Sequence, residues 1–158
     1  MSQGVQSSYR QRILKAEPGQ IADLQPKILK SGKANGTALG YIEFGVVVAA
    51  GINPDEIRLV STFPPIGITV RDIARENDQN GKAFYDDKET ASYMVNGYVY
   101  CVIDGVGSAG DSLTYEKLTG KLSTAPPGPF NGEINACLDE DCNTSGDITR
   151  VFVYVDAP

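Results

Sequence analysis

The amino-acid sequence predicts an all-β fold, a small β-barrel or a jelly-roll-like β-sandwich with an extended N-terminal arm. Turn-forming residues are frequent, with 17 Gly and 9 Pro spread along 158 residues, and this favours short strands over long helices. Between the turns, runs rich in β-branched and aromatic residues recur at a spacing of roughly 8 to 12 residues. Hydrophobic residues make up 41% of the chain, enough for the core of one domain. We therefore divide the chain into an arm, residues 1–16, and a single β-rich domain, residues 17–158.

The beginning of the chain predicts two different kinds of segment. The arm is polar and has few sizeable apolar side chains, and terminal residues of this composition are normally mobile unless another surface holds them. The domain then opens with EPGQIADLQP, residues 17–26, where prolines bound a stretch too short for a useful helix. We expect a turn-like, half-buried element that offers Ile21 and Leu24 as its apolar surface.

The first half of the domain alternates strand signals with turn signals. Glycine and proline separate runs of β-branched and aromatic residues, which is typical of short strands. The expected elements, in chain order, are a strand in YIEFGVVVAAG (41–51), a strand IRLVSTF (57–63) stopped by Pro64 and Pro65, an alternating strand from Ile66 to Val70, a short helical turn around Asp72 to Arg75, and a polar loop over 77–91.

The second half carries the clearest strand pattern and a distinctive final strand. The expected elements are a strand ending at a turn at Asn96–Gly97, a strong strand from Tyr98 to Ile103, a glycine-rich turn, a strand from Ser112 to Tyr115, a turn at Thr119–Gly120, a short strand before the proline-rich loop, and a last strand in ITRVFVYVDAP. This last strand has apolar residues on both faces, so we expect it to be buried on both sides or to lie at an interface.

Composition argues against several functional classes. The net charge of −6 opposes contact with nucleic-acid phosphates. There is no apolar run of transmembrane length and no hydrophobic signal-peptide core. The absence of His removes Ser-His and Cys-His pairs as well as His metal ligands. We therefore expect a protein that is not an enzyme, uses no cofactor and binds neither nucleic acid nor membrane.

The three cysteines are an odd number and cannot form a complete disulfide framework within one chain. Cys101 lies in the apolar run YVYCVI and is expected in the core. Cys137 and Cys142 are spaced C-x4-C in CLDEDC and could pair if oxidised. A metal site made of thiols alone would need further ligands, so we interpret all three as reduced and structural.

Two motifs resemble ligand-binding loops without completing their patterns. The segment from Gly105 to Gly110 reads G-x-G-x-x-G, but a dinucleotide site needs a helix after it, and hairpin-like sequence follows instead. A flexible β-turn is the expected structure. Asp141, Asn143 and Ser145 follow the spacing that opens a calcium loop. Position 12 of that loop is Phe152 in place of a carboxylate, so a solvated acidic turn is expected, with weak calcium binding as the alternative.

Several segments together resemble the structural cement, or head decoration, proteins of tailed bacteriophages. The resemblance lies in PGQIAD near the start, in ALGYIEFGVVVAAG about twenty residues later, and in NGYVYCVIDGVGSAGDSLTYEKLTGKL with its Gly110–Asp111 and Thr119–Gly120 turns. It covers roughly residues 17–51 and 84–125. The segment PPGPFNGEINACLDEDCNTSGD lies outside the resemblance and is expected to be a loop specific to this lineage.

The resemblance implies a non-enzymatic protein, made in the host bacterial cytoplasm, that binds the outer surface of a phage head. There it would bridge neighbouring capsomers, with the major capsid protein and its own copies as partners, a trimer being favoured over a dimer. The candidate residues for capsid or subunit contacts are Tyr9, Arg10, Arg12, Ile13, Ile21 and Leu24. For Ile21 and Leu24 the alternative is that they close one end of the barrel. The alternative function is a virion or cell-surface module that recognises a carbohydrate or receptor.

Overall fold

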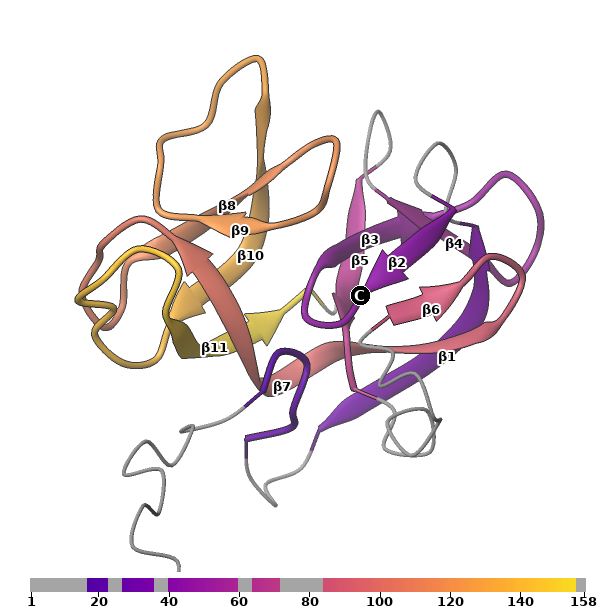
Figure 1. Cartoon of the computed structure of the whole chain (residues 1–158), viewed down its shortest axis with the longest axis horizontal. Helices are drawn as coiled ribbons and strands as arrows, with labels where there is room; N and C mark the ends of the chain where they lie inside the picture. Colours follow the sequence, from indigo (N-terminus) through magenta and orange to yellow (C-terminus); the bar gives the residue numbers. More distant parts are fainter. Residues whose placement is uncertain (1–16, 23–26, 36–39, 60–63, 72–83, 156–158) are drawn as a thin grey trace, which may run out of the picture.

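The computed structural model describes residues 17–22, 27–35, 40–59, 64–71 and 84–155. This part of the chain forms strands and no helix (Figure 1), which confirms the all-β prediction. It accordingly has no helix able to cross a membrane. The strands are β1 (Ile28–Asn35), β2 (Tyr41–Glu43), β3 (Val47–Ala50), β4 (Glu56–Leu59), β5 (Pro65–Thr69), β6 (Phe84–Asp86), β7 (Thr90–Asp104), β8 (Ser112–Glu116), β9 (Leu122–Ser123), β10 (Asn131–Leu138) and β11 (Ile148–Tyr154).

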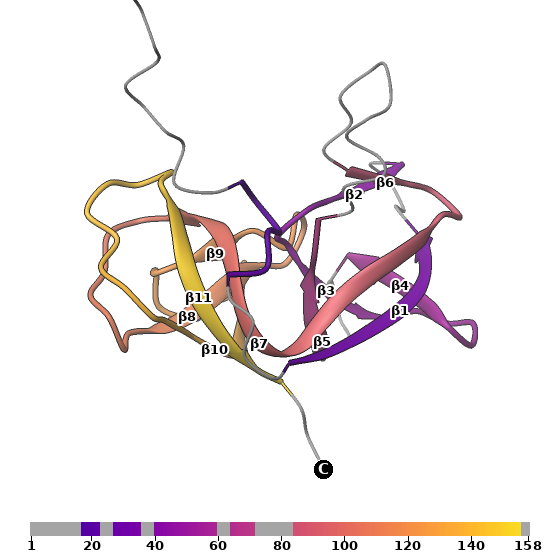
Figure 2. The same cartoon turned by 90° about the horizontal axis from the view of Figure 1, so that it is seen from below.

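The long strand β7 takes part in two closed rings of strands, which form the two lobes seen in Figure 2. The first ring runs β1-β4-β3-β5-β7 and closes through the pairing of β7 with β1. The second runs β7-β11-β10-β8-β9 and closes through the pairing of β9 with β7. The β1–β4 and β7–β9 pairs are parallel and the other pairs in the rings antiparallel. Of the two predicted architectures, the barrel is therefore the one adopted.

The expected turn at Asn96–Gly97 is wrong, because β7 continues through both residues. An Asn-Gly pair makes a hairpin when the two flanking strands pair with each other. Here the first half of β7 pairs with β1 and β5, and the second half pairs with β11. Gly97 has φ 141°, and a Cβ atom at this position would lie 2.9 Å from the Cβ of Lys27. Glycine is thus required where the strand passes from one ring to the other.

Two hydrophobic clusters form the core of the protein, and some strands contribute side chains to both of them. One cluster contains the inward side chains of the second ring, including Val99, Cys101 and Ile103. The other is built around Ile57 in the first ring and Tyr85 on β6, which pairs with β2 in a separate two-stranded sheet. Along β3 the side chains alternate between the two clusters, as the two-residue period of a strand requires. The clusters are therefore in contact through a common sheet.

Three strands lie where the sequence did not indicate them. β1 has a largely exposed, lysine-rich sequence, and β6 lies inside the segment 77–91 that was expected to be a loop. β10 lies inside the segment expected to be a lineage-specific loop, where its buried residues Ile134, Ala136 and Leu138 alternate with Asn135 and Cys137. The expected helical turn at 72–75 lies outside the described residues.

The predicted strand over 41–51 is divided into β2 and β3 by residues 44–46. Gly45 has φ 74°, and Gly19 also has a positive φ of 80°. A Cβ atom on Gly45 would lie 2.9 Å from the backbone nitrogen of Gly19. The two glycines therefore allow the opening segment of the domain to approach the first ring closely.

The opening segment EPGQI lies between the two lobes and hydrogen-bonds to both (Figure 2). The Gly19 N–H donates to the Tyr100 carbonyl on β7 at 2.7 Å, and the Gly19 carbonyl accepts from the Arg71 N–H at 2.7 Å. Ile21 forms an antiparallel bridge with Val99. The segment is thus an irregular strand that covers the edge of β7 left open after its exit from the first ring.

Candidate functional site

The sheet formed by β7, β11 and β10 has one buried face and one aromatic face. Val151 and Val153 on β11 are fully buried in the core. Between and after them, Phe152 is half-buried and Tyr154 is 41% exposed. The last strand therefore covers the core with one face and turns aromatic rings outward with the other, which leaves the predicted second apolar face accessible.

The aromatic side chains of this outer face contact one another across the strands. The ring of Tyr98 lies opposite Phe152 in the antiparallel register, with centroids 4.9 Å apart. Phe152 also stacks on Tyr154, at 5.5 Å and an interplanar angle of 26°. A cross-strand aromatic pair such as Tyr98–Phe152 contributes about 0.5–1.5 kcal/mol beyond area burial. We call the set Tyr98, Phe152 and Tyr154 the aromatic face.

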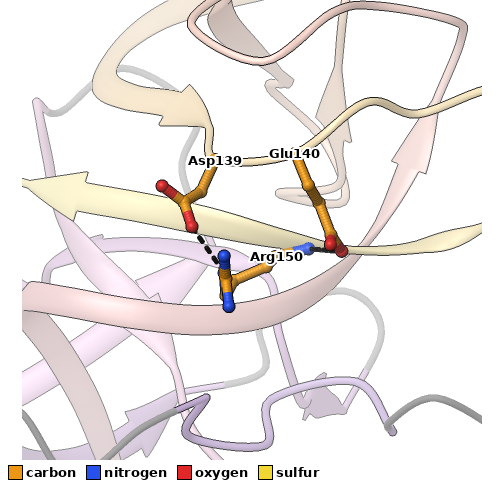
Figure 3. Close-up of polar contacts among 3 residues, drawn as sticks. All are labelled: Asp139, Glu140 and Arg150. Atoms are coloured by element: carbon orange, nitrogen blue, oxygen red, sulfur yellow. Dashed lines mark hydrogen bonds and ion pairs between the residues drawn. The ribbon is translucent and has the colours of Figure 1, made fainter.

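Arg150, whose side chain is held by an ion pair, borders the aromatic face on the same strand. The Arg150 side chain donates from Nε to Asp139 Oδ2 at 2.5 Å, and its backbone N–H donates to Glu140 Oε1 at 2.9 Å (Figure 3). The hydrogen bond that Arg150 donates to Asp139 is the main cause that raises the pKa of Arg150. The cation is therefore held in one place beside the aromatic rings, although its side chain remains 38% exposed.

Two loops are joined at the end of the second ring. Gly107 and Cys142 form a backbone bridge, with hydrogen bonds of 3.0 and 2.9 Å in the two directions. Gly107 belongs to the G-x-G-x-x-G motif, so this motif forms a turn that pairs with the 139–147 loop and is not followed by a helix. This is the β-turn that the sequence predicted.

The side chains of the calcium candidate bind the facing loop. Asp141 Oδ1 accepts from the Ala109 N–H at 2.8 Å. The Ser145 hydroxyl donates to Asp104 Oδ1 and accepts from the Gly105 N–H. Asn143, the third candidate, is exposed. In the described residues no three His, Cys, Asp or Glu side chains are grouped to hold a metal ion, and calcium binding stays a prediction.

The three cysteines are free thiols in different surroundings. Cys101 is fully buried, and burial raises its pKa strongly. The buried Cys142 donates through Sγ to the carbonyl oxygens of Gly105 and Thr144, both at 3.4 Å. Cys137 lies next to Phe152 in the register, and partial burial, with the Asp139 charge, raises its pKa. A raised thiol pKa lowers reactivity, which fits structural roles.

The predicted contact residues fall mostly outside the described part of the chain. Tyr9, Arg10, Arg12, Ile13 and Leu24 lie in segments that the structure does not describe. Ile21 is half-buried and packs against the core of the second ring. The aromatic face was signalled only by the two apolar faces of the last strand. The ion pair of Arg150 had no sequence signal, because its partner Asp139 lies in the loop after β10, 11 residues away along the chain.

The fold and its exposed features define a class of protein: a small mixed β-barrel whose most distinctive surface is an aromatic sheet face. The chain belongs to the phage structural cement protein family, since the family model described as structural cement protein (E217 gp24/Pam3 gp6) matches residues 5–153. The protein is accordingly a non-enzymatic structural component of a phage capsid. This confirms the resemblance seen in the sequence.

A solved structure shows the same fold at low sequence identity. A chain from the structure titled "The capsid of Myoviridae Phage XM1" superimposes with a TM-score of 0.70 and 12% identity. The match covers 92% of this chain and 94% of that one. No curated protein matches the chain.

Proposed function

We propose that this cement protein binds the outer surface of the phage head and stabilises it by bridging neighbouring capsomers. The observation that carries the proposal is the family match over residues 5–153. The exposed aromatic face supports it, because it is a preformed surface on a rigid three-stranded sheet. Aromatic side chains supply large contact areas at a low cost in conformational entropy, and they dominate the energetics of many interfaces.

The bridging itself rests on several modest contacts acting together. A homo-oligomer of cement subunits presents several copies of the aromatic face, so the second and third contacts form at high effective concentration. We propose a trimer, which suits the three-fold positions of a capsid. Each aromatic face then contacts a capsid subunit, and Arg150 at its border pairs with acidic groups of that subunit.

The N-terminal arm provides a second attachment. Residues 1–16 contain two Arg and one Lys and no acidic residue, whereas the whole chain has a net charge of −6. We propose that Tyr9, Arg10, Arg12 and Ile13 contact the capsid or a neighbouring copy.

Deleting residues 1–16 is expected to abolish binding to heads while the domain keeps its far-ultraviolet circular dichroism spectrum. Sedimentation with cement-free heads measures the binding. Full retention of binding by the truncated protein would show that the arm is not an attachment.

The copy number in purified particles tests the proposed function directly. Quantitative mass spectrometry against the major capsid protein is expected to give a simple ratio near one cement chain per capsid subunit. A handful of copies per particle would place the protein at a vertex or on the tail and overturn the proposal of bridging across the head.

A further inference from the structure

The first half of β1 has a strand edge to which no described strand is paired. Residues Lys33 to Asn35 pair with β4, while residues Ile28 to Lys33 pair with β7 on the opposite edge. In the ranges that the structure describes, residues 28–32 therefore have a strand neighbour on the β7 side only. Figure 1 shows this half of β1 running beside β7, beyond the end of β4.

The register identifies the backbone groups that point to this edge. The Lys33 N–H donates to the Asp55 carbonyl at 2.6 Å, so it faces the β4 side. Successive residues of a strand point their backbone groups to opposite edges. The register between β1 and β7 is continuous from Leu29 to Lys33. The N–H and C=O groups of Leu29 and Ser31 consequently face the same side as those of Lys33.

The side chains on this half-strand decide which partner it can accept. Ile28 and Leu29 are 40% and 41% exposed, and Lys30 and Lys33 are also exposed. Lysines on a strand edge oppose pairing with a second copy of the same edge, because that copy brings the same charges. They favour a strand that carries carboxylates beside apolar residues. The lysine charges therefore favour pairing with a strand of a different protein over pairing with β1 of a second copy.

We propose that the edge of β1 to which no described strand is paired, residues 28–32, binds an extended, acidic segment of the capsid subunit by β-strand addition. The inference rests on the proposed function and names a further attachment point for it, besides the aromatic face and the arm, on the ring that does not carry the aromatic face. Backbone hydrogen bonds to Leu29 and Ser31 hold the added strand. Ile28 and Leu29 cover its apolar side chains, and Lys30 and Lys33 pair with its carboxylates.

A proline at position 31 tests the backbone contact. Ser31→Pro removes the outward N–H and leaves the bonds to β7, because proline is tolerated on the open side of an edge strand. Ser31→Ala keeps the N–H and is the matched control. Binding to purified cement-free heads is expected to weaken about tenfold for Ser31→Pro and to stay unchanged for Ser31→Ala. Equal binding of the two variants would overturn the inference.

Two further measurements keep the test independent of a folding defect in the proline variant. Lys30→Glu is expected to weaken head binding, while Lys88→Glu, at an exposed lysine of the β6–β7 turn, is not. In the unaltered protein, hydrogen exchange of the peptide covering residues 28–32 is expected to slow when heads are added. Unchanged exchange in the bound protein would contradict strand addition.

The outcomes separate this inference from the proposed function. If Tyr154→Ser, a substitution on the aromatic face, loses binding and Ser31→Pro does not, the inference fails and the proposed function stands. If the unaltered protein does not bind heads, both fail. If Ser31→Pro changes only the mass of the isolated oligomer, the edge pairs with a second copy and the inference is wrong.

Discussion

Gly19 is the residue at which the opening segment meets both lobes. Its φ of 80° is in the left-handed region, and a Cβ atom there would lie 2.8 Å from the Arg71 nitrogen and 2.9 Å from the Phe44 Cβ. Glu17 adds an ion pair to Arg71. In the turn-like element that the sequence predicted, Gly19 is therefore required by packing as well as by the change of chain direction.

Replacing Gly19 by Ala is expected to destabilise the protein more than replacing Gly110, its matched control. Both have a positive φ, but a Cβ atom on Gly110 would meet nothing within 4 Å. Gly110→Ala should cost about 1 kcal/mol from backbone strain alone. Gly19→Ala should add about 1–3 kcal/mol from overpacking. Urea unfolding measures both losses, and equal losses would contradict the close approach.

Glu56 gives a pH-dependent prediction at the same scale. Hydrogen bonds from the side-chain amides of Asn35 and Asn53, both at 2.6 Å, lower the pKa of the half-buried Glu56. Because the folded-state pKa is depressed, the carboxylate stabilises the fold above its unfolded-state pKa. That stabilisation is lost as the pH falls through the folded-state pKa.

Asn53→Ala is expected to move the Glu56 pKa up towards its usual value, which nuclear magnetic resonance titration of the carboxyl carbon measures. Asn143→Ala, at an exposed asparagine in another loop, is the control and should leave that titration unchanged. An unchanged Glu56 pKa in Asn53→Ala would show that the Asn53 amide does not hydrogen-bond to the Glu56 carboxylate when the protein is in solution.

Among the elements, β11 was predicted well because its own residues carry the strand pattern. Its alternation of Val and aromatic residues indicates a strand, and its two apolar faces indicate an interface. β10 and β1 could not be predicted in this way. Gly, Asn and Glu interrupt the apolar positions of β10, and β1 is mostly exposed, so both are strands because of their neighbours and not because of intrinsic preference.

The aromatic face leads to a prediction about binding. Tyr154→Ser is expected to weaken binding to heads about tenfold, because it removes an exposed ring that stacks on Phe152. It should change the free energy of unfolding little, since Tyr154 is 41% exposed. Leu118→Ser is the control: Leu118 is 72% exposed on the turn between β8 and β9. If the two substitutions affect binding equally, the aromatic face is not the contact surface.

At the scale of the whole molecule, the sharing of β7 was hidden from sequence reasoning. Each ring contains one parallel pair, β1 with β4 and β7 with β9, whose two strands are not consecutive along the chain. The Asn96–Gly97 pair predicted a turn, so the prediction divided β7, the strand common to both rings, into two strands. Likewise, the Val47 N–H of β3 bonds to the Gly120 carbonyl of the other lobe at 2.8 Å, a contact without a local pattern.

These shared elements predict that the two lobes unfold together. Neither ring is complete without β7, and the opening segment and Gly120 link the lobes further. Urea unfolding is expected to give one transition, with the same midpoint by circular dichroism and by tyrosine fluorescence, the chain having no Trp. Two separate midpoints would mean that one lobe folds without the other.

A continuous strand that closes two barrels also determines how the protein responds to tension. In antiparallel ladders the hydrogen bonds lie perpendicular to the strands, so a pull along β7 loads many of them in shear at the same moment. One half of β7 is paired with β1 and β5, and the other half is paired with β11. A force that draws the two lobes apart would therefore pass along a covalent backbone, and separation would require whole ladders to slide rather than a single bond to open.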